Sequence, residues 1–342
     1  MLLSVAIVSV SAEESAELTE VELIELKLRQ ADANKDGTYS TEDAAEVLRA
    51  AAGVVPDGED FDFTGDGSTT VDDAIKMLRI LSGMDTVITE EETLTLFNSK
   101  LNGCKSDKPG FSKVATAQCR SMKISQDVIA SNALVGALLG DMKFTDLEYD
   151  KYVEKMISMM DPDDLSAEEK EQIAEMRESA ETYKDPQYQY ATVEANDYYD
   201  HYKYFPREYN NVSSTLTIAD ISSIKYTMLN GNICFYLTMP KTSYGTNTYP
   251  SDDSTIPYGK VFNLVDFGTS DGSVVNNITF NNGKITMYVD SVTGAVKEVN
   301  YSYDYSSDIT APPQTQSDAT LGSITVTVRT KTSATIKEDF VF

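Results

Sequence analysis

The chain has 342 residues, 41% of them hydrophobic, so it is long enough to bury a substantial core and to form two or three domains. It carries 55 acidic and 28 basic residues, and this formal charge of −27 disfavours nucleic acid and anionic membrane surfaces as partners. A single histidine excludes any site that needs two. The absence of tryptophan removes the commonest sugar-stacking side chain, although 20 tyrosines remain.

The first residues predict export. Residues 2–10 are apolar but too few to span a bilayer, and Val10, Ser11 and Ala12 are small residues where a signal peptidase would cut. We therefore interpret residues 1–12 as part of a signal peptide and expect a secreted, extracellular or cell-surface protein. An N-terminus that is merely apolar and frayed is the alternative.

The three cysteines leave two interpretations open. Cys104 and Cys119 flank a Lys-Pro-Gly break and are placed to pair across a turn, whereas three buried thiols are the alternative. Cys234 stands in a strand-like run and is expected in the core. An odd count without CxxC spacing argues against a disulfide framework and against a zinc cluster.

Acidic residues are concentrated near the front of the chain, where residues 1–90 hold 20 acidic and 6 basic side chains. Residues 32–43 form a twelve-residue pattern with side-chain oxygens at positions 1, 3 and 5, a glycine at 6 and a closing aspartate at 12. Calcium takes six to eight oxygen ligands, and this spacing wraps them around one ion. Gly37 is needed at position 6 because the chain turns there with positive φ.

Residues 62–73 repeat the pattern with threonine at position 3, so we expect the second site to bind more loosely. Two Ca²⁺ ions are thus predicted. The predicted ligands are Asp32, Asn34, Asp36, Thr38, Ser40 and Asp43 in the first loop, and Asp62, Thr64, Asp66, Ser68, Thr70 and Asp73 in the second. Thr38 and Ser68 at position 7 offer backbone carbonyls, and Ser40 at position 9 can act through water.

Each loop leads into a predicted helix, and a further helix over residues 17–30 enters the first loop. The similarity between the two repeats continues for ten residues past each loop, at an offset of thirty, which indicates an internal duplication. Helical spacing places Ala44, Val47, Leu48 and Ala51 on one face, and Ala74, Met77, Leu78 and Leu81 likewise. Because so little of residues 13–86 is apolar, we expect this module to need metal for stable folding.

Residues 26–84 resemble dockerins, the calcium-folded modules that dock extracellular bacterial proteins onto cohesins in cellulosome-type complexes. The duplication, the closing aspartates and the absence of a helix before the second loop carry the resemblance. It implies a cohesin-bearing scaffold protein as partner and a Gram-positive-type bacterium as host. It also implies that the cohesin contacts are Thr41, Glu42, Leu48 and Arg49 in the first repeat and Val71, Asp72, Leu78 and Arg79 in the second.

The remaining residues, 87–342, are predicted to form an α+β domain. Residues 87–205 are expected to be mainly helical, with capping boxes that begin helices after Thr89, Thr145 and Ser166, a strand over 111–124 and a buried helix over 125–139. Residues 183–209 hold many tyrosines and the lone His201. A sugar-stacking platform and a connection whose rings pack on the sheet edge are the two interpretations, and we favour the second.

Residues 206–342 are predicted to be an antiparallel sheet. Hairpin turns are expected at Asn230-Gly231, at residues 281–283 and at residues 290–294, with a last hairpin between 324–329 and 334–342. Residues 242–257 and 306–318 are predicted to be long loops. The fold class is therefore α+β: a small all-α, EF-hand-like module, then a helical region packed on a twisted antiparallel β-meander.

This C-terminal region also resembles exported proteins of gut Firmicutes. The similar features are an FP dipeptide, residues 217–221 (TIADI), residues 259–262 (GKVF) and the hairpin at 290–294, which is similar to turns of PepSY-type modules as well. Neither resemblance implies an activity.

Three functions remain open. The favoured one is a non-catalytic, dockerin-bearing protein whose C-terminal domain binds a glycan, a peptide or a surface partner. The second is a dockerin-borne polysaccharide-degrading enzyme such as a glycoside hydrolase, and the third is a calcium-stabilised structural protein without a cohesin partner. No nucleophile motif is recognisable and no catalytic residue is assigned; a deep cleft with two convergent carboxylates would favour the enzyme.

Overall fold

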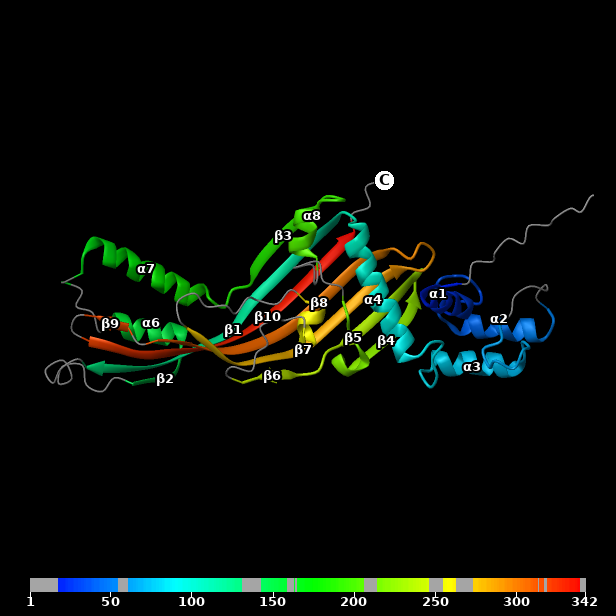
Figure 1. The fold of residues 1–342 in the computed structure, drawn as a ribbon, viewed down its shortest axis with the longest axis horizontal. Helices are drawn as coiled ribbons and strands as arrows, with labels where there is room; N and C mark the ends of the chain where they lie inside the picture. Colours follow the sequence, from blue (N-terminus) through cyan, green and yellow to red (C-terminus); the bar gives the residue numbers. More distant parts are fainter. Residues whose placement is uncertain are drawn as a thin grey trace, which may run out of the picture. The chain divides into compact units, whose positions relative to one another are not determined.

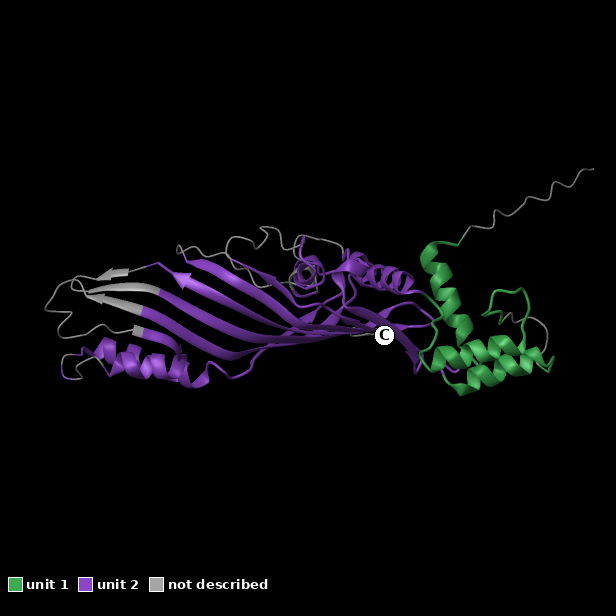
Figure 2. Ribbon diagram, turned by 90° about the horizontal axis from the view of Figure 1, so that it is seen from below, with its two compact units in different colours: residues 1–35, 40–88 green, residues 36–39, 89–342 purple. Residues whose placement is uncertain are grey.

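The structure is a computed structural model with two compact units (Figure 2). Unit 1 comprises residues 1–35 and 40–88, and unit 2 comprises residues 36–39 and 89–342. The described residues are 18–54, 61–130, 143–158, 163, 165–205, 214–245, 255–262, 273–312, 314–316 and 319–338. The expected signal peptide, residues 1–12, lies outside them.

Unit 1 is helical. Its elements are α1 (Glu20–Ala31), α2 (Thr41–Ala51) and α3 (Val71–Leu81). Each begins with a capping box, in which an N-cap hydroxyl and a carboxylate three residues later satisfy backbone N–H groups reciprocally. Gly53 and Gly83 follow α2 and α3 with φ of 68° and 72°, the left-handed conformation that commonly ends a helix. One buried cluster consists of Ala33, Val47, Phe61 and Ala74, with Ala50 and Phe63 against it. The other buried apolar residues described in this unit are Ile24, Leu28, Ala31, Ala44, Met77 and Ile88.

Unit 2 is mixed α and β and is built on one antiparallel sheet (Figure 1). The main path is β2-β1-β10-β8-β7-β5-β4, with β3 pairing β1, β6 pairing β7 and β9 pairing β10. The strands are β1 (Phe111–Ala130), β2 (Lys143–Glu148), β3 (Gln187–Val193), β4 (Ser223–Leu229), β5 (Asn232–Thr238), β6 (Thr242–Tyr244), β7 (Val274–Asp290), β8 (Val296–Ala311), β9 (Gln314–Gln316) and β10 (Ala319–Glu338). Strands β4, β5, β7, β8 and β10 therefore form the expected meander, and β1 pairs with its last strand.

The helices of unit 2 lie at the two ends of the sheet (Figure 1). They are α4 (Glu90–Asp107), α6 (Tyr149–Ile157), α7 (Ala167–Thr182) and α8 (Tyr198–Tyr204), with short 3-10 turns η1 (Ile218–Asp220) and η3 (Tyr258–Lys260). The capping boxes predicted at Thr89 and Ser166 are confirmed. Residues 36–39 belong to unit 2 because they bond to the β4–β5 turn, where Gly231 N donates to Gly37 O at 2.9 Å.

One face of the sheet, the inner face, carries the core of unit 2. On α4, Phe97 packs edge-to-face on Phe235 with ring centroids 6.0 Å apart. On η3, Tyr258 stacks on Phe280 at 5.1 Å. At the far end, α6 and α7 cover a second cluster formed by Ile124, Phe144, Tyr152, Val153 and Ala180.

Two predicted hairpins of the C-terminal half are wrong. Strand β7 runs without a turn through residues 281–283, which form a bulge marked by a register shift between Asn281 and Lys284. Strand β10 runs unbroken between Arg329 and Ala334. The segment 306–318, predicted to be a loop, contains the end of β8 and the whole of β9. Strand β10 begins directly after it, at Ala319. The polar residues of these runs imitate turn composition although they stand within long strands, and Ser307 and Thr330 among them are buried.

The region 87–205 is also less helical than predicted. Strand β1 continues through residues 125–130, where a buried helix was expected; residues 131–139 of that expected helix lie outside the described part. Thr145 lies within β2, and α6 begins after Glu148 without a side-chain cap. This region thus supplies β1, β2 and β3, because pairing with β10 offers the 111–130 segment a full ladder of backbone hydrogen bonds.

The bulge in β7 yields a testable prediction. Gly283 is buried, its N–H donates to the Tyr258 hydroxyl at 3.1 Å, and a Cβ there would lie 2.6 Å from Tyr258 Cε1 and 2.7 Å from Met239 Cβ. Gly283→Ala is therefore expected to destabilise unit 2 by about 1–3 kcal/mol through overpacking. Denaturant unfolding measures the change.

Gly103→Ala is the matched control. Gly103 lies within α4 and a Cβ there meets nothing within 4 Å, so this change should stabilise by about 0.5–1 kcal/mol through lower chain entropy. Equal effects of the two substitutions would show that the bulge is not closely packed.

Candidate metal centre

The second loop, residues 62–73, is organised around its first carboxylate. Asp62 accepts backbone N–H bonds from Gly65 at 2.6 Å, from Asp66 at 3.0 Å and from Gly67 at 2.8 Å. Gly67, at position 6, has φ of 89°. The bond from Gly67 leads the causes that lower the pKa of Asp62, so this carboxylate is ionised at neutral pH.

The closing aspartates of the two loops occupy the same hydrogen-bond frame. Asp73 accepts from the N–H of Thr64 at 2.8 Å and of Thr70 at 2.7 Å, which are positions 3 and 9. Asp43 accepts from the same two positions of its own loop, Asn34 N at 3.2 Å and Ser40 N at 2.7 Å. Both aspartates are fully buried, and these bonds offset the cost of burying a charge.

The pKa of Asp73 follows from this frame. Burial is the largest influence and raises it, yet the bonds from Thr70 and Thr64 together outweigh burial and leave the pKa below its ordinary value. The closing carboxylate is thus kept anionic inside the module, the state that a cation requires.

The donor set matches a hard, oxygen-preferring cation. Asp36 and Asp66, at position 5, each accept the backbone N–H of position 7, Thr38 at 2.8 Å and Ser68 at 3.0 Å. Over the described residues, no group of three or more His, Cys, Asp or Glu side chains is spaced to hold a metal. The structure thus does not bring the three carboxylates of either loop together as a metal-holding group. Each loop also offers amide, hydroxyl and main-chain oxygens, which calcium loops ordinarily use besides carboxylates.

The residues assigned to partner contact are all exposed on α2 and α3. They are Thr41, Glu42, Leu48, Arg49, Val71, Asp72, Leu78 and Arg79. Leu48 and Leu78 are each 47% exposed, whereas Val47 and Met77 beside them are fully buried. The apolar face predicted for each helix is thus only partly buried, and its two leucines lie on the exposed side.

The sequence analysis missed Ile75. It is 49% exposed and lies one helical turn from Val71 and from Leu78, so α3 presents a continuous apolar stripe. The sequence feature that could have identified Ile75 is its i, i+4 spacing from Val71.

The two arginines of the predicted contact surface differ in their ion pairs. Arg49 pairs with Glu46 in its own helix, and Arg79 Nε lies 2.6 Å from Asp85 Oδ2 beyond its helix.

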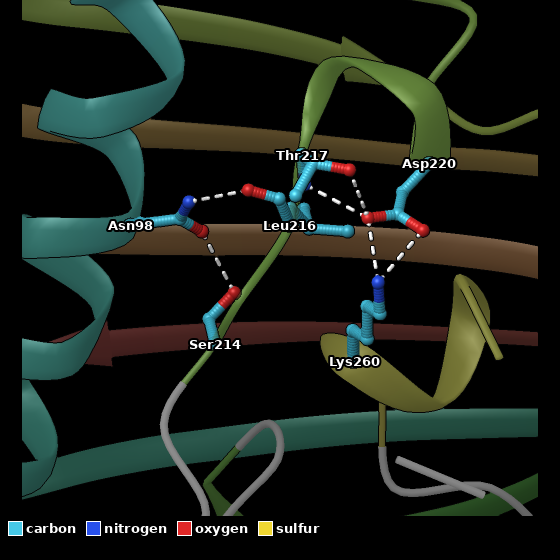
Figure 3. Close-up of polar contacts among 6 residues, drawn as sticks. All are labelled: Asn98, Ser214, Leu216, Thr217, Asp220 and Lys260. Carbon is cyan, nitrogen blue, oxygen red and sulfur yellow. Dashed lines mark hydrogen bonds and ion pairs between the residues drawn. The ribbon is translucent and has the colours of Figure 1, made fainter. Parts of the chain in front are cut away.

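In unit 2, one polar cluster joins segments that the sequence singled out (Figure 3). Asp220 accepts from Thr217 N at 2.8 Å and Oγ1 at 2.7 Å, and from Lys260 Nζ at 2.7 and 2.8 Å. Burial raises the pKa of Asp220, but the bonds from Lys260 and Thr217 outweigh it and lower the pKa overall. From α4, Asn98 bonds Leu216 O and the Ser214 hydroxyl. These hydrogen bonds connect residues 214–220 to α4 on one side and to η3 on the other.

The three cysteines form no disulfide. The open pairing of Cys104 with Cys119 is therefore not observed, Cys104 and Cys234 are buried, and Cys119 is only partly buried. Burial raises the pKa of Cys119 and Cys234, so neither is an activated nucleophile. His201 lies in α8.

Comparison with known proteins identifies no relative: no family model matches the chain, and no curated protein or solved structure is significantly similar to it. Among the described helices, none has the length and apolar character needed to cross a bilayer.

Proposed function

We propose that the chain is a non-catalytic, calcium-dependent docking protein of extracellular assemblies. Residues 13–86 bind two Ca²⁺ ions and dock onto a cohesin-bearing scaffold protein, and unit 2 holds a ligand or surface partner. The observation that carries the proposal is the duplicated frame in which Asp43 and Asp73 accept the N–H groups of positions 3 and 9 of their own loops.

Calcium binding supplies folding free energy that the apolar core of residues 13–86 does not provide. Of the ten buried apolar side chains described in unit 1, four are alanines, so the buried apolar area is modest for an independent unit. Metal binding converts directly into folding free energy when the site exists only in the folded state. The acidic excess of residues 1–90 is explained in the same way, because bound cations offset the repulsion among carboxylates.

The docking surface lies on the exposed sides of α2 and α3. Both helices present a leucine followed by an arginine at equivalent positions, and α3 adds Val71 and Ile75. Arginine is enriched among the residues that contribute most to interfaces, and the exposed leucines beside it offer apolar area to bury. We place the cohesin contact on this surface.

The test is calcium-dependent capture of the full chain by a panel of cohesins. Leu48→Asp with Leu78→Asp is expected to weaken capture about a hundredfold, since each buried interface anchor contributes about tenfold or more. Surface plasmon resonance in calcium and in chelator measures it.

The matched control is Leu23→Asp with Leu26→Asp. These leucines lie on α1 and are 46% and 37% exposed, so the control introduces the same charges on equally accessible leucines. Capture that is independent of calcium, or a control pair that weakens capture as much, would contradict the docking proposal.

A further inference from the structure

The outer face of the unit 2 sheet, opposite the inner face defined above, is hollowed. Strands β1, β10, β8 and β7 border a depression of about 640 Å³. A second depression of about 470 Å³ extends it toward the β3 edge and shares Lys284, Ser302 and Lys331 with it. We call the two together the outer trough.

The charge in the trough is opposite to that of the chain. Its larger depression is lined by five bases and one acid, although the whole chain has 28 bases and 55 acids. The bases are Arg120, Lys241, Lys284, Arg329 and Lys331, and all five are exposed. Across the described part of the chain, no ion pair involves any of these five side chains.

The single acid in the lining, Asp304, already accepts a hydrogen bond within the protein. Asn282 Nδ2 donates to Asp304 Oδ2 at 2.6 Å. Lys331 lies directly opposite Asp304 in the β8–β10 ladder without forming an ion pair with it. The five cations therefore remain available to an anionic ligand, for which charge complementarity would supply orientation and attraction.

The rest of the lining consists mainly of hydroxyl and amide side chains. They are Thr116, Thr279, Asn281, Thr286, Asn300, Ser302, Ser306, Ser333 and Thr335. Such groups donate and accept hydrogen bonds, as the free hydroxyls of a sugar require. Thr279, Asn300 and Thr335 already bond to protein side chains. The others can bond to ligand hydroxyls, which a ligand of charge alone, such as a phosphate chain, lacks.

Strand β3 lies beside β1 at the edge of the sheet (Figure 1), and two of its tyrosines extend the outer trough. Tyr188 and Tyr190 lie opposite Thr116 and Val114 of β1, which line the trough, so all four share a face of the sheet. The rings are nearly parallel at 20°, their centroids are 6.3 Å apart, and they are 59% and 71% exposed. The favoured interpretation, rings packed on the sheet edge, is thus wrong for this pair, and exposed parallel rings are suited to stacking on sugars.

We propose that the outer trough binds an anionic polysaccharide whose charge is carried by uronate carboxylates. Unlike a heavily sulfated chain, a uronate chain keeps free hydroxyls beside each carboxylate, and the lining offers partners for both. From β3 to β7 the trough crosses four interstrand steps, about 19 Å, enough for several sugar rings. The inference rests on the proposed ligand-binding role of unit 2 but is independent of calcium docking.

The test is binding of the full chain to polygalacturonate, with dextran and single-stranded DNA as comparison polymers. Affinity electrophoresis is run in chelator, so that calcium neither occupies the loops nor bridges carboxylates. We expect binding to polygalacturonate that weakens with salt, and none to dextran. Lys284→Glu with Lys331→Glu should weaken it about tenfold or more, and Tyr188→Ala with Tyr190→Ala about fivefold.

Lys151→Glu with Lys170→Glu is the matched control, because these exposed lysines of α6 and α7 change the net charge equally at a distance from the trough. Three outcomes would overturn the proposal: no binding to polygalacturonate, equal weakening by the control pair, or DNA bound as tightly as polygalacturonate. None of them affects the calcium proposal, since cohesin capture is measured separately and in calcium.

Discussion

Replacing Asp32 and Asp62 together with alanine is expected to abolish the calcium-dependent stability of unit 1. Each residue is position 1 of its loop, and the Asp62 carboxylate also organises the N–H groups of positions 4, 5 and 6. A ligand that binds only the folded state stabilises it by about 4 kcal/mol at a thousandfold excess over Kd, and here two sites contribute. The difference in unfolding free energy with and without calcium isolates the metal contribution from the lost hydrogen bonds.

Titration calorimetry of the full chain should count two calcium ions in the parent and none in the variant, while the unfolding transition of unit 2 is retained. Glu42→Ala with Asp72→Ala is the matched control, because it removes two exposed carboxylates at equivalent positions of the same repeats. Absence of binding at millimolar calcium in the parent, or equal loss in the control, would refute the assignment of the loops.

Removing the Asp220 carboxylate is expected to produce the largest loss of stability in unit 2. In Asp220→Ala, the Lys260 ammonium, whose side chain is 18% exposed, would keep its charge without a partner. Breaking a buried pair from one side costs about 3–5 kcal/mol. The hydrogen bonds that connect residues 214–220 to η3 would be lost as well. Denaturant unfolding of unit 2 measures the loss of stability.

The same pair predicts a pH dependence. The pKa of Asp220 lies below its ordinary value of 3.8 in the folded state, so its stabilisation is complete above that ordinary value and is lost as pH falls through the folded value. The parent should therefore lose more stability on acidification below about pH 4 than Asp220→Ala does. Asp185→Ala, an exposed acid before β3, is the control and should follow the parent curve.

Local signals predicted local structure well. Both central residues of the Asn230-Gly231 turn have positive φ, as a two-residue hairpin requires. At the next confirmed hairpin, Asp290 accepts the N–H groups of Val292 and Thr293 as expected. These features depend on residues within a few positions of one another, so no distant contact was needed to choose them.

Strand continuity was less predictable. The Asn-Asn-Gly segment at 281–283 has the composition of a turn, but Gly283 lies against Tyr258 and Met239, which are distant in sequence. Residues 125–139 were predicted to be a buried helix because apolar residues predominate over that whole segment, yet β10 supplies residues 125–130 with a strand partner about two hundred positions later. Long-range pairing overrides local propensity wherever it satisfies more backbone groups.

The candidate sites show the same contrast between local sequence signals and long-range contacts. Spacing alone predicted oxygen ligands in both loops, since a calcium loop draws its ligands from twelve consecutive residues. Helical spacing placed Leu48 and Leu78 on the apolar face of their helices, and only the dockerin resemblance implied that they are exposed, as they are in the structure. The outer trough was not predicted at all, since its bases come from β1, β7, β10 and the residue before β6.

The sequence by itself determined the acidic balance, the duplicated loop-and-helix pattern and the short hairpin turns, because each is encoded by charge or by neighbours along the chain. Only the tertiary structure decided that β1 pairs with β10, that long strands replace two predicted hairpins, and that five cations and two tyrosines share one face of the sheet. These depend on which distant strands become neighbours, and that choice is made by the burial and hydrogen bonding of the whole sheet.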